Sequence, residues 1–233
     1  MFLRDSVKTK LYDDNKGDER KIKGIDVITK SPIDVIAEQP SPRFLKSHLP
    51  LSLLPPKALE AKMVHVARDP RDAIVSYYHL IKSMKLVELE DDFKSFWNST
   101  IKNCQPWTPY FDNVKEAWEN RHHPNLLFLF YEDLRKDLPS EVRRVCDFFG
   151  KKFSDEQIAG LCDHLSFENF KNNPSVNYDL MKEIGLMRNQ EIVEYRQLIK
   201  NLNRNIAQTN KMGSKILVQQ TNHSNGVFLL TTQ

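Results

Sequence analysis

Short apolar runs alternate with stretches of helical periodicity over residues 43–150 of the chain. Three of the runs have the length of a β-strand, and they span residues 43–48, 62–67 and 126–131. The third run is apolar without alternation, which is typical of a strand that is covered on both faces. We therefore predict three strands of a buried sheet.

Helical patterns follow two of these strands. Asp69 is a capping residue, Pro70 occupies the first helical position, and apolar side chains then recur at helical spacing up to Met84. A second helix is predicted within residues 139–150, where it ends at a glycine, and aromatic residues at helical intervals predict further helices within residues 90–120. Strands that alternate with helices indicate crossover connections. The predicted fold class is therefore α/β, with a parallel sheet flanked by helices.

The two ends of the chain differ in composition from this central part. The beginning is predicted to be a polar, partly disordered lead-in, with a charge-dense loop over residues 13–21 and one short helix that starts at Pro32. Near the other end asparagine and glutamine become frequent, and a weak helical pattern over residues 192–202 is followed by nothing periodic. The predicted division is a lead-in, a core and a poorly packed tail, over residues 1–42, 43–187 and 188–233.

The composition is that of an ordinary soluble globular protein. Of 233 residues, 40% are hydrophobic and 28% are charged, which excludes a disordered chain, a collagen-like chain and a coiled coil. The net charge of +3 is spread along the chain, so we expect no nucleic-acid partner. No apolar run approaches the ~20 residues that a membrane-spanning helix needs, and the N-terminus lacks the pattern of a signal peptide. We expect a cytoplasmic protein without a membrane partner.

The cysteines and glycines exclude several kinds of site. The spacing of Cys104, Cys146 and Cys162 suits neither a zinc site nor a disulfide framework, so we expect reduced thiols and no metal. The seven glycines are dispersed, which excludes a GxGxxG turn and a GxxxxGK[ST] loop within the chain, and with the latter a P-loop kinase. Phosphate binding must therefore rely on side chains and helix N-termini.

Polar residues stand where the predicted strands end, which is where open parallel sheets bind ligands. Arg68 follows the second strand and precedes a helix N-terminus, and Ser76 lies beside the apolar stripe of that helix. An arginine and a hydroxyl in this arrangement suit a compact dianion such as a phosphate monoester. The alternative is that Ser76 bonds to its own helix while Arg68 pairs with a neighbouring carboxylate of Asp69, Asp72 or Glu132.

His48 follows the first strand and precedes a Leu-Pro stop, and Lys46 lies two residues earlier on the same face. An imidazole with an unperturbed pKa of about 6.5 accepts a proton in its neutral form at cellular pH. Repulsion from Lys46 favours that neutral form, and the ammonium can neutralise negative charge that develops nearby. The alternative is a surface histidine in a loop.

Three motifs, in this order, resemble those of the cytosolic sulfotransferases. They are Lys46-Ser47-His48-Leu49-Pro50, the segment from Val66 through Arg68-Asp69-Pro70-Arg71-Asp72 to Tyr78, and Phe130-Tyr131-Glu132-Asp133-Leu134. The similarity covers roughly residues 30–180. It implies a P-loop-like α/β fold and transfer of the sulfuryl group from 3′-phosphoadenosine 5′-phosphosulfate (PAPS) to a small-molecule acceptor, which is a phenol, another alcohol or an amine.

The resemblance also implies a role for each matching residue at the strand ends. His48 matches the catalytic base of the family, and Lys46 matches a lysine beside the substrate. Arg68 and Ser76 match the pair that binds the 3′-phosphate of PAPS, and Tyr131 matches a tyrosine that contacts the cofactor.

Residues 165–170 resemble the segment that the family places beside the adenine. Ser166 and Phe167 are therefore expected to bind the nucleotide, with the ring of Phe167 stacked on the base. Leu165 stands where the family usually has threonine, which removes one expected hydrogen bond to the nucleotide.

Both ends of the chain depart from the family pattern. The phosphosulfate loop, the C-terminal clamp on the 3′-phosphate and the dimerisation segment find no match. We therefore expect a truncated or divergent chain whose sheet lacks its first strand and keeps an unpaired edge, and whose sulfuryl transfer is impaired. The alternative is a non-catalytic nucleotide-binding or interaction fragment that pairs with a full-length relative. A homodimer is left open.

Overall fold

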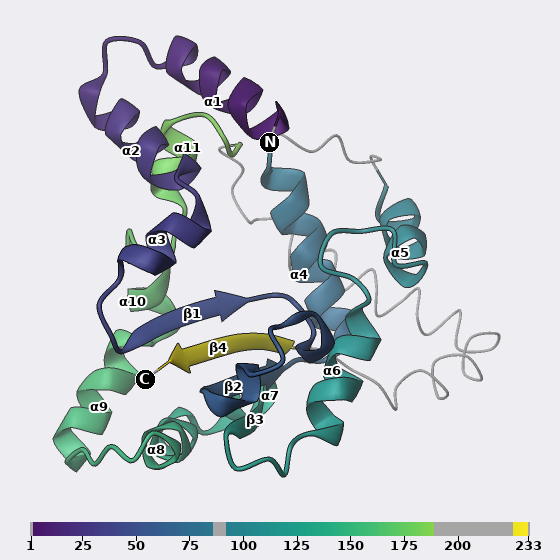
Figure 1. Cartoon of the computed structure of the whole chain (residues 1–233), viewed down its shortest axis with the longest axis vertical. Coiled ribbons are helices and arrows are strands. Elements are labelled where there is room, and N and C mark those ends of the chain that lie inside the picture. The colour runs from purple at the N-terminus through teal and green to yellow at the C-terminus, as the bar shows by residue number, and fades with distance from the viewer. Residues whose placement is uncertain (1, 86–91, 189–225, 233) are drawn as a thin grey trace. The chain divides into compact units, whose positions relative to one another are not determined.

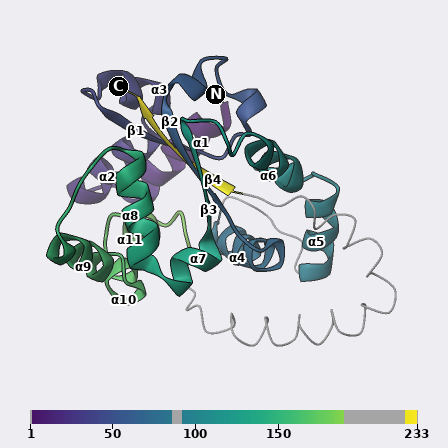
Figure 2. The ribbon, with the colours of Figure 1, turned by 90° about the horizontal axis from the view of Figure 1, so that it is seen from below.

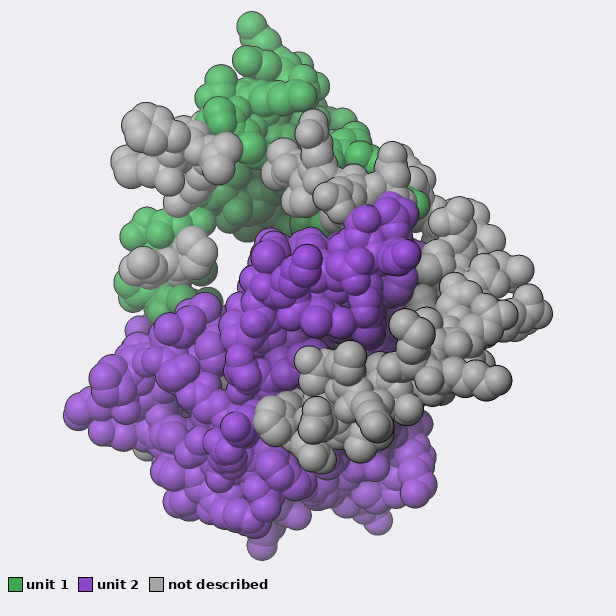
Figure 3. Space-filling view, turned by 90° about the vertical axis from the view of Figure 1, so that its right-hand side faces the viewer, with its two compact units in different colours: residues 1–40, 80–89, 163–191 green, residues 41–79, 90–162, 192–233 purple. Residues whose placement is uncertain are grey.

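The computed structural model of the chain describes residues 2–85, 92–188 and 226–232 (Figure 1). The chain divides into two compact units, which Figure 3 distinguishes by colour. We call residues 1–40, 80–89 and 163–191 the helical unit, and residues 41–79, 90–162 and 192–233 the sheet unit. Each unit has a buried apolar cluster of its own.

The sheet has four strands in the order β1-β4-β2-β3. Their bounds are Arg43–Ser47 for β1, Lys62–Ala67 for β2, Leu126–Phe130 for β3 and Gly226–Thr232 for β4. Strands β2 and β3 are parallel, whereas β4 runs antiparallel to both β1 and β2. Strands β1, β2 and β3 therefore all run in one direction. The predicted α/β class and the three predicted strands are confirmed.

Strand β4 lies in the part of the chain where no regular element was expected. It pairs along the whole of β1 and of β2, so the prediction of an unpaired edge at the centre of the sheet is wrong, and β1 and β3 are the outer strands of the described sheet. A run of valine, phenylalanine, leucine and threonine favours a strand, but the sequence pattern does not reveal which distant segment such a run will pair with. The weak helical pattern over residues 192–202 lies outside the described residues, and the division of the chain at residues 42 and 187 stays a prediction.

Helices connect the strands of the sheet unit as expected from their caps. Helix α4 spans Pro70–Ser83, and the carboxylate of Asp69 accepts from one amide of its first turn, that of Arg71, at 2.9 Å. Helix α8 spans Leu138–Phe148 behind a capping Asp137, and Gly150 follows it with a positive φ of 64°. The remaining α-helices of this region are α5 (Phe93–Ile101), α6 (Tyr110–Glu119), α7 (Tyr131–Lys136) and α9 (Asp155–His164). Short 3₁₀ turns span Leu51–Leu53 and Ala58–Glu60.

Helix α6 covers one face of the sheet, and Figure 2 shows α6 and α8 on opposite sides of the strands. Ala117 of this helix is buried against Met63 of β2 and Leu126 of β3. On the same face of β2, His65 is fully buried and its ring lies 5.1 Å from that of Phe128. Burial therefore lowers the pKa of His65 to about 3 and keeps its imidazole neutral.

The helical unit differs from the polar lead-in that the sequence predicts. Helices α1 (Phe2–Asp14) and α2 (Glu19–Thr29) leave only a short turn where the charge-dense loop was expected, and α3 (Pro32–Glu38) confirms the predicted short helix. Leu11 and Ile25 pack with Ile184, which follows helix α11 (Asp179–Glu183) far along the chain. Because this partner is distant in sequence, the local charge pattern does not reveal that the two helices bury an apolar stripe.

Neither a membrane-spanning helix nor a metal-binding cluster is found in the described part of the chain. None of its helices is long and apolar enough to cross a bilayer. These residues also contain no group of three or more His, Cys, Asp and Glu side chains that could hold a metal ion. The cysteines are free.

Candidate functional site

The residues that follow the strands lie at one edge of the sheet. Because β1, β2 and β3 run in the same direction, their carboxyl ends point to the same side. His48 follows β1, Arg68 follows β2 and Tyr131 follows β3. Ala67 pairs with Phe130 in the parallel ladder, so Arg68 and Tyr131 are the first residues beyond two neighbouring strands. This is the edge where ligands of open α/β sheets bind.

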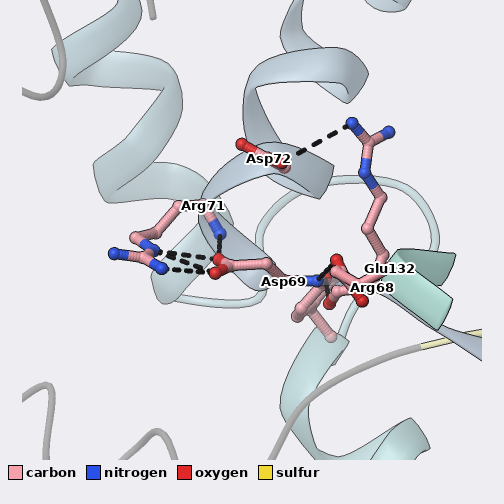
Figure 4. Close-up of polar contacts among 6 residues, drawn as sticks. Arg68, Asp69, Arg71, Asp72 and Glu132 are labelled. Atoms are coloured by element: carbon pink, nitrogen blue, oxygen red, sulfur yellow. Dashed lines mark hydrogen bonds and ion pairs between the residues drawn. The ribbon is translucent and has the colours of Figure 1, made fainter. Parts of the chain in front are cut away.

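Arg68 is held by an aromatic ring and by a carboxylate. Its guanidinium carbon lies 4.4 Å from the ring centroid of Tyr131, within the range of a cation–π contact. One guanidinium nitrogen lies 3.9 Å from a carboxylate oxygen of Asp72 in the first turn of α4 (Figure 4). The side chain is only 24% exposed. The structure thus contains the carboxylate pairing that was the alternative for Arg68, and the partner is Asp72.

The carboxylate of Asp69 is engaged on the other side of the same turn. It forms an ion pair with Arg71, whose Nε lies 2.9 Å from one carboxylate oxygen (Figure 4). Hydrogen bonding from the Arg71 side chain lowers the pKa of Asp69. The backbone amide of Asp69 donates to Glu132 Oε1 at 2.8 Å, which ties the end of β2 to the start of α7. Arg71 and Glu132 therefore fix the turn that carries Arg68.

Ser76 lies in the second turn of α4, in the same strand–helix unit as Arg68, and it is half-buried. Arg68 thus precedes α4, and the hydroxyl of Ser76 belongs to the same helix. The phosphate-binding role of the two residues stays a prediction.

His48 and Lys46 lie at the end of β1. Lys46 is exposed, while His48 is half-buried immediately beyond the strand. Desolvation by burial, and secondly the positive charge of Lys46, lower the pKa of His48. The expected electrostatic effect of the lysine on the histidine is therefore present. Its consequence is a neutral imidazole at physiological pH.

Trp107 covers the imidazole of His48 and was not among the residues singled out from the sequence. The two ring centroids lie 4.7 Å apart with an interplanar angle of 32°. Trp107 has a positive φ of 63°, a conformation that costs a bulky residue on the order of 1–3 kcal/mol and that surrounding contacts must maintain. One such contact is the hydrogen bond from the Tyr77 hydroxyl to the carbonyl of Pro106, at 2.8 Å. Burial raises the pKa of Tyr77 to about 12, so this hydroxyl stays protonated and remains a donor.

Helix α6 reaches the backbone beside both candidate residues. The Tyr110 hydroxyl donates to the carbonyl of Arg68 at 3.2 Å, and Asn113 Nδ2 donates to the carbonyl of His48 at 3.4 Å. These two contacts were also missed. The sequence does hold a signal for them. Tyr110 and Asn113 place polar groups three positions apart, on a helix face that otherwise packs on the sheet.

Ser166 and Phe167 belong to the helical unit. Ser166 caps the short helix α10 (Phe167–Lys171), and its hydroxyl accepts from the amide of Asn169 at 3.4 Å. The Phe167 side chain is 67% exposed, so its ring is accessible. Their role beside an adenine stays a prediction.

The chain is similar in sequence to a known protein family and to several characterised proteins. Residues 7–212 match the family described as the sulfotransferase domain. The chain is 34% identical to sulfotransferase 1E1 of Bos taurus over 183 residues, which cover 72% of this chain and 62% of that protein. It is 36% identical to sulfotransferase 1C2 of Homo sapiens over 149 residues, which cover 63% of this chain and 50% of that protein.

Two solved structures of retinol dehydratase are also similar to the chain. One is a complex with androsterone and the inactive cofactor PAP, and it is 45% identical, with a TM-score of 0.69 over 77% of this chain and 53% of that one. The other is a complex with retinol and PAP, and it is 47% identical, with a TM-score of 0.69 over 76% of this chain and 53% of that one. The chain thus spans between half and 62% of the length of these relatives.

Proposed function

Because the chain belongs to the sulfotransferase family, we propose that it binds PAPS and that its sheet edge is built to transfer the sulfuryl group to a hydroxyl or amine of a small acceptor. The observation that carries this proposal is that Arg68 with Tyr131, and His48 with Lys46, lie at the ends of strands that run in one direction. A cation for a phosphate and a neutral base are thereby available at the same edge.

His48 acts as the general base in this proposal. Its lowered pKa keeps the imidazole neutral, so it can take the proton of the acceptor hydroxyl as the acceptor oxygen attacks sulfur. A bond forms between the acceptor oxygen and sulfur, and the bond between sulfur and the bridging phosphate oxygen breaks. The bonding electrons leave with 3′-phosphoadenosine 5′-phosphate (PAP). The sulfated acceptor and PAP are the products, and the proton remains on His48 until solvent removes it.

Charge stabilisation is the larger contribution in this type of reaction. By analogy with phosphoryl transfer, positioning and electrostatics supply most of the rate enhancement, whereas general-base assistance typically supplies about 10²–10⁴-fold. Lys46 is exposed at the end of β1, where its ammonium can approach the negative charge of the migrating group.

Arg68 and Ser76 are the proposed ligands of the 3′-phosphate. Arg68 replaces its 3.9 Å contact with Asp72 by charge-assisted hydrogen bonds to phosphate oxygens, which are shorter and stronger. Tyr131 supports the guanidinium from the neighbouring strand. Ser166 and Phe167 are proposed to bind the adenine, because an exposed aromatic ring offers a face on which a base can stack.

An apolar alcohol is the proposed acceptor. The solved relatives were bound to androsterone and to retinol, both of which combine a hydroxyl with a large apolar body. The flat indole of Trp107 beside the imidazole of His48 provides an apolar surface next to the proposed base. Phenols and amines remain within the proposed acceptor class.

Transfer by residues 1–233 alone is proposed to be slow. The family's glycine-containing phosphosulfate loop has no counterpart among the dispersed glycines of this chain. The hydrogen-bond donors of comparable oxyanion sites each lower the barrier by about 3–4 kcal/mol, so a chain without them retains the base but little of the charge stabilisation. A radiolabelled-sulfate assay with PAPS and a panel of phenols, steroid alcohols and retinol tests this. Rapid transfer that His48→Ala abolishes would refute the proposed impairment.

The second candidate is a non-catalytic nucleotide-binding or interaction fragment that pairs with a full-length relative. Calorimetry with PAP distinguishes this candidate in part from the proposed sulfotransferase function. Micromolar binding that is lost in Arg68→Ala supports the cofactor site, whereas the absence of binding favours an interaction fragment without a small-molecule ligand. Sedimentation of the chain alone and with a full-length relative tests self-association and pairing. For the proposed sulfotransferase, we also propose a cytoplasmic location.

A further inference from the structure

Helix α6 forms hydrogen bonds to the backbone of the two residues to which the proposed function assigns the base and the phosphate ligand. Tyr110 Oη lies 3.2 Å from the carbonyl oxygen of Arg68, and Asn113 Nδ2 lies 3.4 Å from the carbonyl oxygen of His48. Residues three apart on a helix lie on one face, so the two donors point to the sheet together. One turn of helix therefore spans the ends of β1 and β2.

The same segment also contacts the side chain of His48. Trp107, three residues before Tyr110, lies against the imidazole with a centroid separation of 4.7 Å. Its loop is in turn bound to α4 through the Tyr77 hydroxyl and the carbonyl of Pro106. Residues 106–113 thus contact His48 at both its ring and its backbone, and Arg68 at its backbone.

A contribution to folding stability alone does not explain why position 113 carries an asparagine. The residue is 4% exposed, and its Oδ1 is buried without a hydrogen-bond partner among the described residues. A buried acceptor without a partner is destabilising, and an apolar side chain of similar volume at this position avoids that cost. Departures from the rule that buried polar groups are satisfied tend to occur at functional sites.

Tyr110 is suited to be a permanent donor. Burial, together with the nearby negative charge of Asp69, raises the pKa of its hydroxyl, so the proton that points to the Arg68 carbonyl is retained. A hydrogen bond to the carbonyl of a residue restrains the backbone from which its side chain extends. The same turn of α6 therefore restrains the backbone that carries the guanidinium and the backbone that carries the imidazole.

We propose that Tyr110 and Asn113 are positioning residues, which fix Arg68 and His48 relative to one another from a single turn of helix α6. This inference rests on the proposed function for the roles of Arg68 and His48. It adds that the spacing between the phosphate ligand and the base is set by α6 rather than by the sheet alone. Neither residue is proposed to contact PAPS or the acceptor.

The test uses the full chain and two substitutions that each remove one donor. Tyr110→Phe deletes only the hydroxyl, and its matched control is Tyr12→Phe in the helical unit, where the Tyr12 hydroxyl bonds to Asp26. Asn113→Leu deletes the amide at similar volume, and its matched control is Asn120→Leu at the C-cap of the same helix, where Asn120 Nδ2 donates to the carbonyl of Glu116 at 2.9 Å.

Three measurements are made on each protein. Calorimetry gives the dissociation constant of PAP, and Tyr110→Phe is expected to raise it about 3- to 10-fold, the range of one lost hydrogen bond. Nuclear magnetic resonance follows the Nε–H signal of Arg68, which the ring of Tyr131 shifts, and the titration of the His48 imidazole. Tyr110→Phe is expected to move the first signal, and Asn113→Leu to bring the His48 midpoint closer to the ordinary histidine value. Both controls leave all three readouts unchanged.

The outcomes separate this inference from the proposed function. If the wild-type protein binds no PAP but the two variants show their expected resonance changes, the cofactor site is refuted and the positioning roles are supported. Wild-type protein that binds PAP, with no change of either resonance in the variants, refutes the positioning roles and leaves the cofactor site intact. A thermal unfolding scan identifies a variant that fails to fold. For such a variant, Tyr110→Trp or Asn113→Gln, which each retain a donor, must restore the readout or the proposal fails.

Discussion

The guanidinium of Arg68 lies 4.4 Å from the ring centroid of Tyr131, and the two residues follow neighbouring parallel strands at the same level of the ladder. The pair places a positive charge, supported by an aromatic face, on a residue that lies two positions before the first residue of α4. Helix N-termini favour anions, so the arginine and the helix act on a bound phosphate in the same sense. This relationship leads to the first prediction.

Arg68→Ala is expected to weaken PAP binding by about 10- to 100-fold, because hydrogen bonds to charged groups contribute about 1.5–3 kcal/mol. Isothermal titration calorimetry with PAP measures the change. Arg20→Ala is the control, since Arg20 is an exposed arginine that pairs with Glu183 in the helical unit. Equal affinity of the Arg68 variant and of wild type contradicts the assignment of the phosphate site.

Trp107→Ala is expected to raise the pKa of His48. Desolvation is the main cause of the lowered pKa, and loss of the indole admits water to the imidazole. Lys46→Ala is expected to raise it as well, by a smaller amount, because the charge of Lys46 is the second cause. Titration of the His48 ring protons by nuclear magnetic resonance gives both values. A larger rise for Lys46→Ala than for Trp107→Ala reverses the assigned order of causes.

The stability of the sheet unit is expected to fall as the pH decreases below about 6.5. His65 has a pKa of about 3 in the folded state, so between these values the unfolded chain binds a proton that the folded chain does not. The free energy of unfolding therefore decreases over this window, by up to about 4–5 kcal/mol at its lower end. Urea unfolding at pH 7, 6, 5 and 4.5 measures the slope. His65→Leu should flatten it, and an identical slope in the variant argues against a neutral buried imidazole.

Glu132→Ala is expected to lower the stability of the turn between β2 and α4. Glu132 accepts the backbone amide of Asp69 at 2.8 Å, and loss of one such bond costs about 1 kcal/mol. Glu132→Gln keeps an acceptor at this position and should lie closer to wild type. Thermal unfolding followed by circular dichroism compares the two variants. If Glu132→Gln is as destabilised as Glu132→Ala, the charge of Glu132 matters more than its hydrogen bond.

Leu229→Pro is expected to disrupt the sheet by removing a backbone donor from a central strand. Leu229 lies opposite Lys46 of β1 and Val64 of β2. Proline within a paired strand is destabilising by about 3 kcal/mol or more, and unpaired strands promote aggregation. Light scattering at 37 °C and urea unfolding report the effect, with Thr232→Pro at the end of the strand as the milder comparison. A soluble Leu229→Pro variant of unchanged stability excludes β4 as a structural strand.

The candidate site was predicted from the sequence where its signals are local. Arg68, Asp69 and Pro70 combine the end of an apolar run with a helix cap, so the position of the arginine at a sheet edge follows from neighbouring residues. The same holds for His48, which stands between a strand and a proline-terminated turn. Trp107, Tyr110 and Asn113 were not predicted, because each acts on a residue more than 40 positions away in the sequence.

The sequence by itself determined the three parallel strands, the helix that follows Arg68 and the motifs that mark the family. These features depend on periodicity and capping, which act over a few residues. Only the tertiary structure decided that β4 pairs between β1 and β2, that Leu11 and Ile25 pack with Ile184, and that one turn of α6 contacts the backbone of both Arg68 and His48. Pairing between distant segments is selected by the burial and hydrogen bonding of the whole fold, and a local pattern does not specify it.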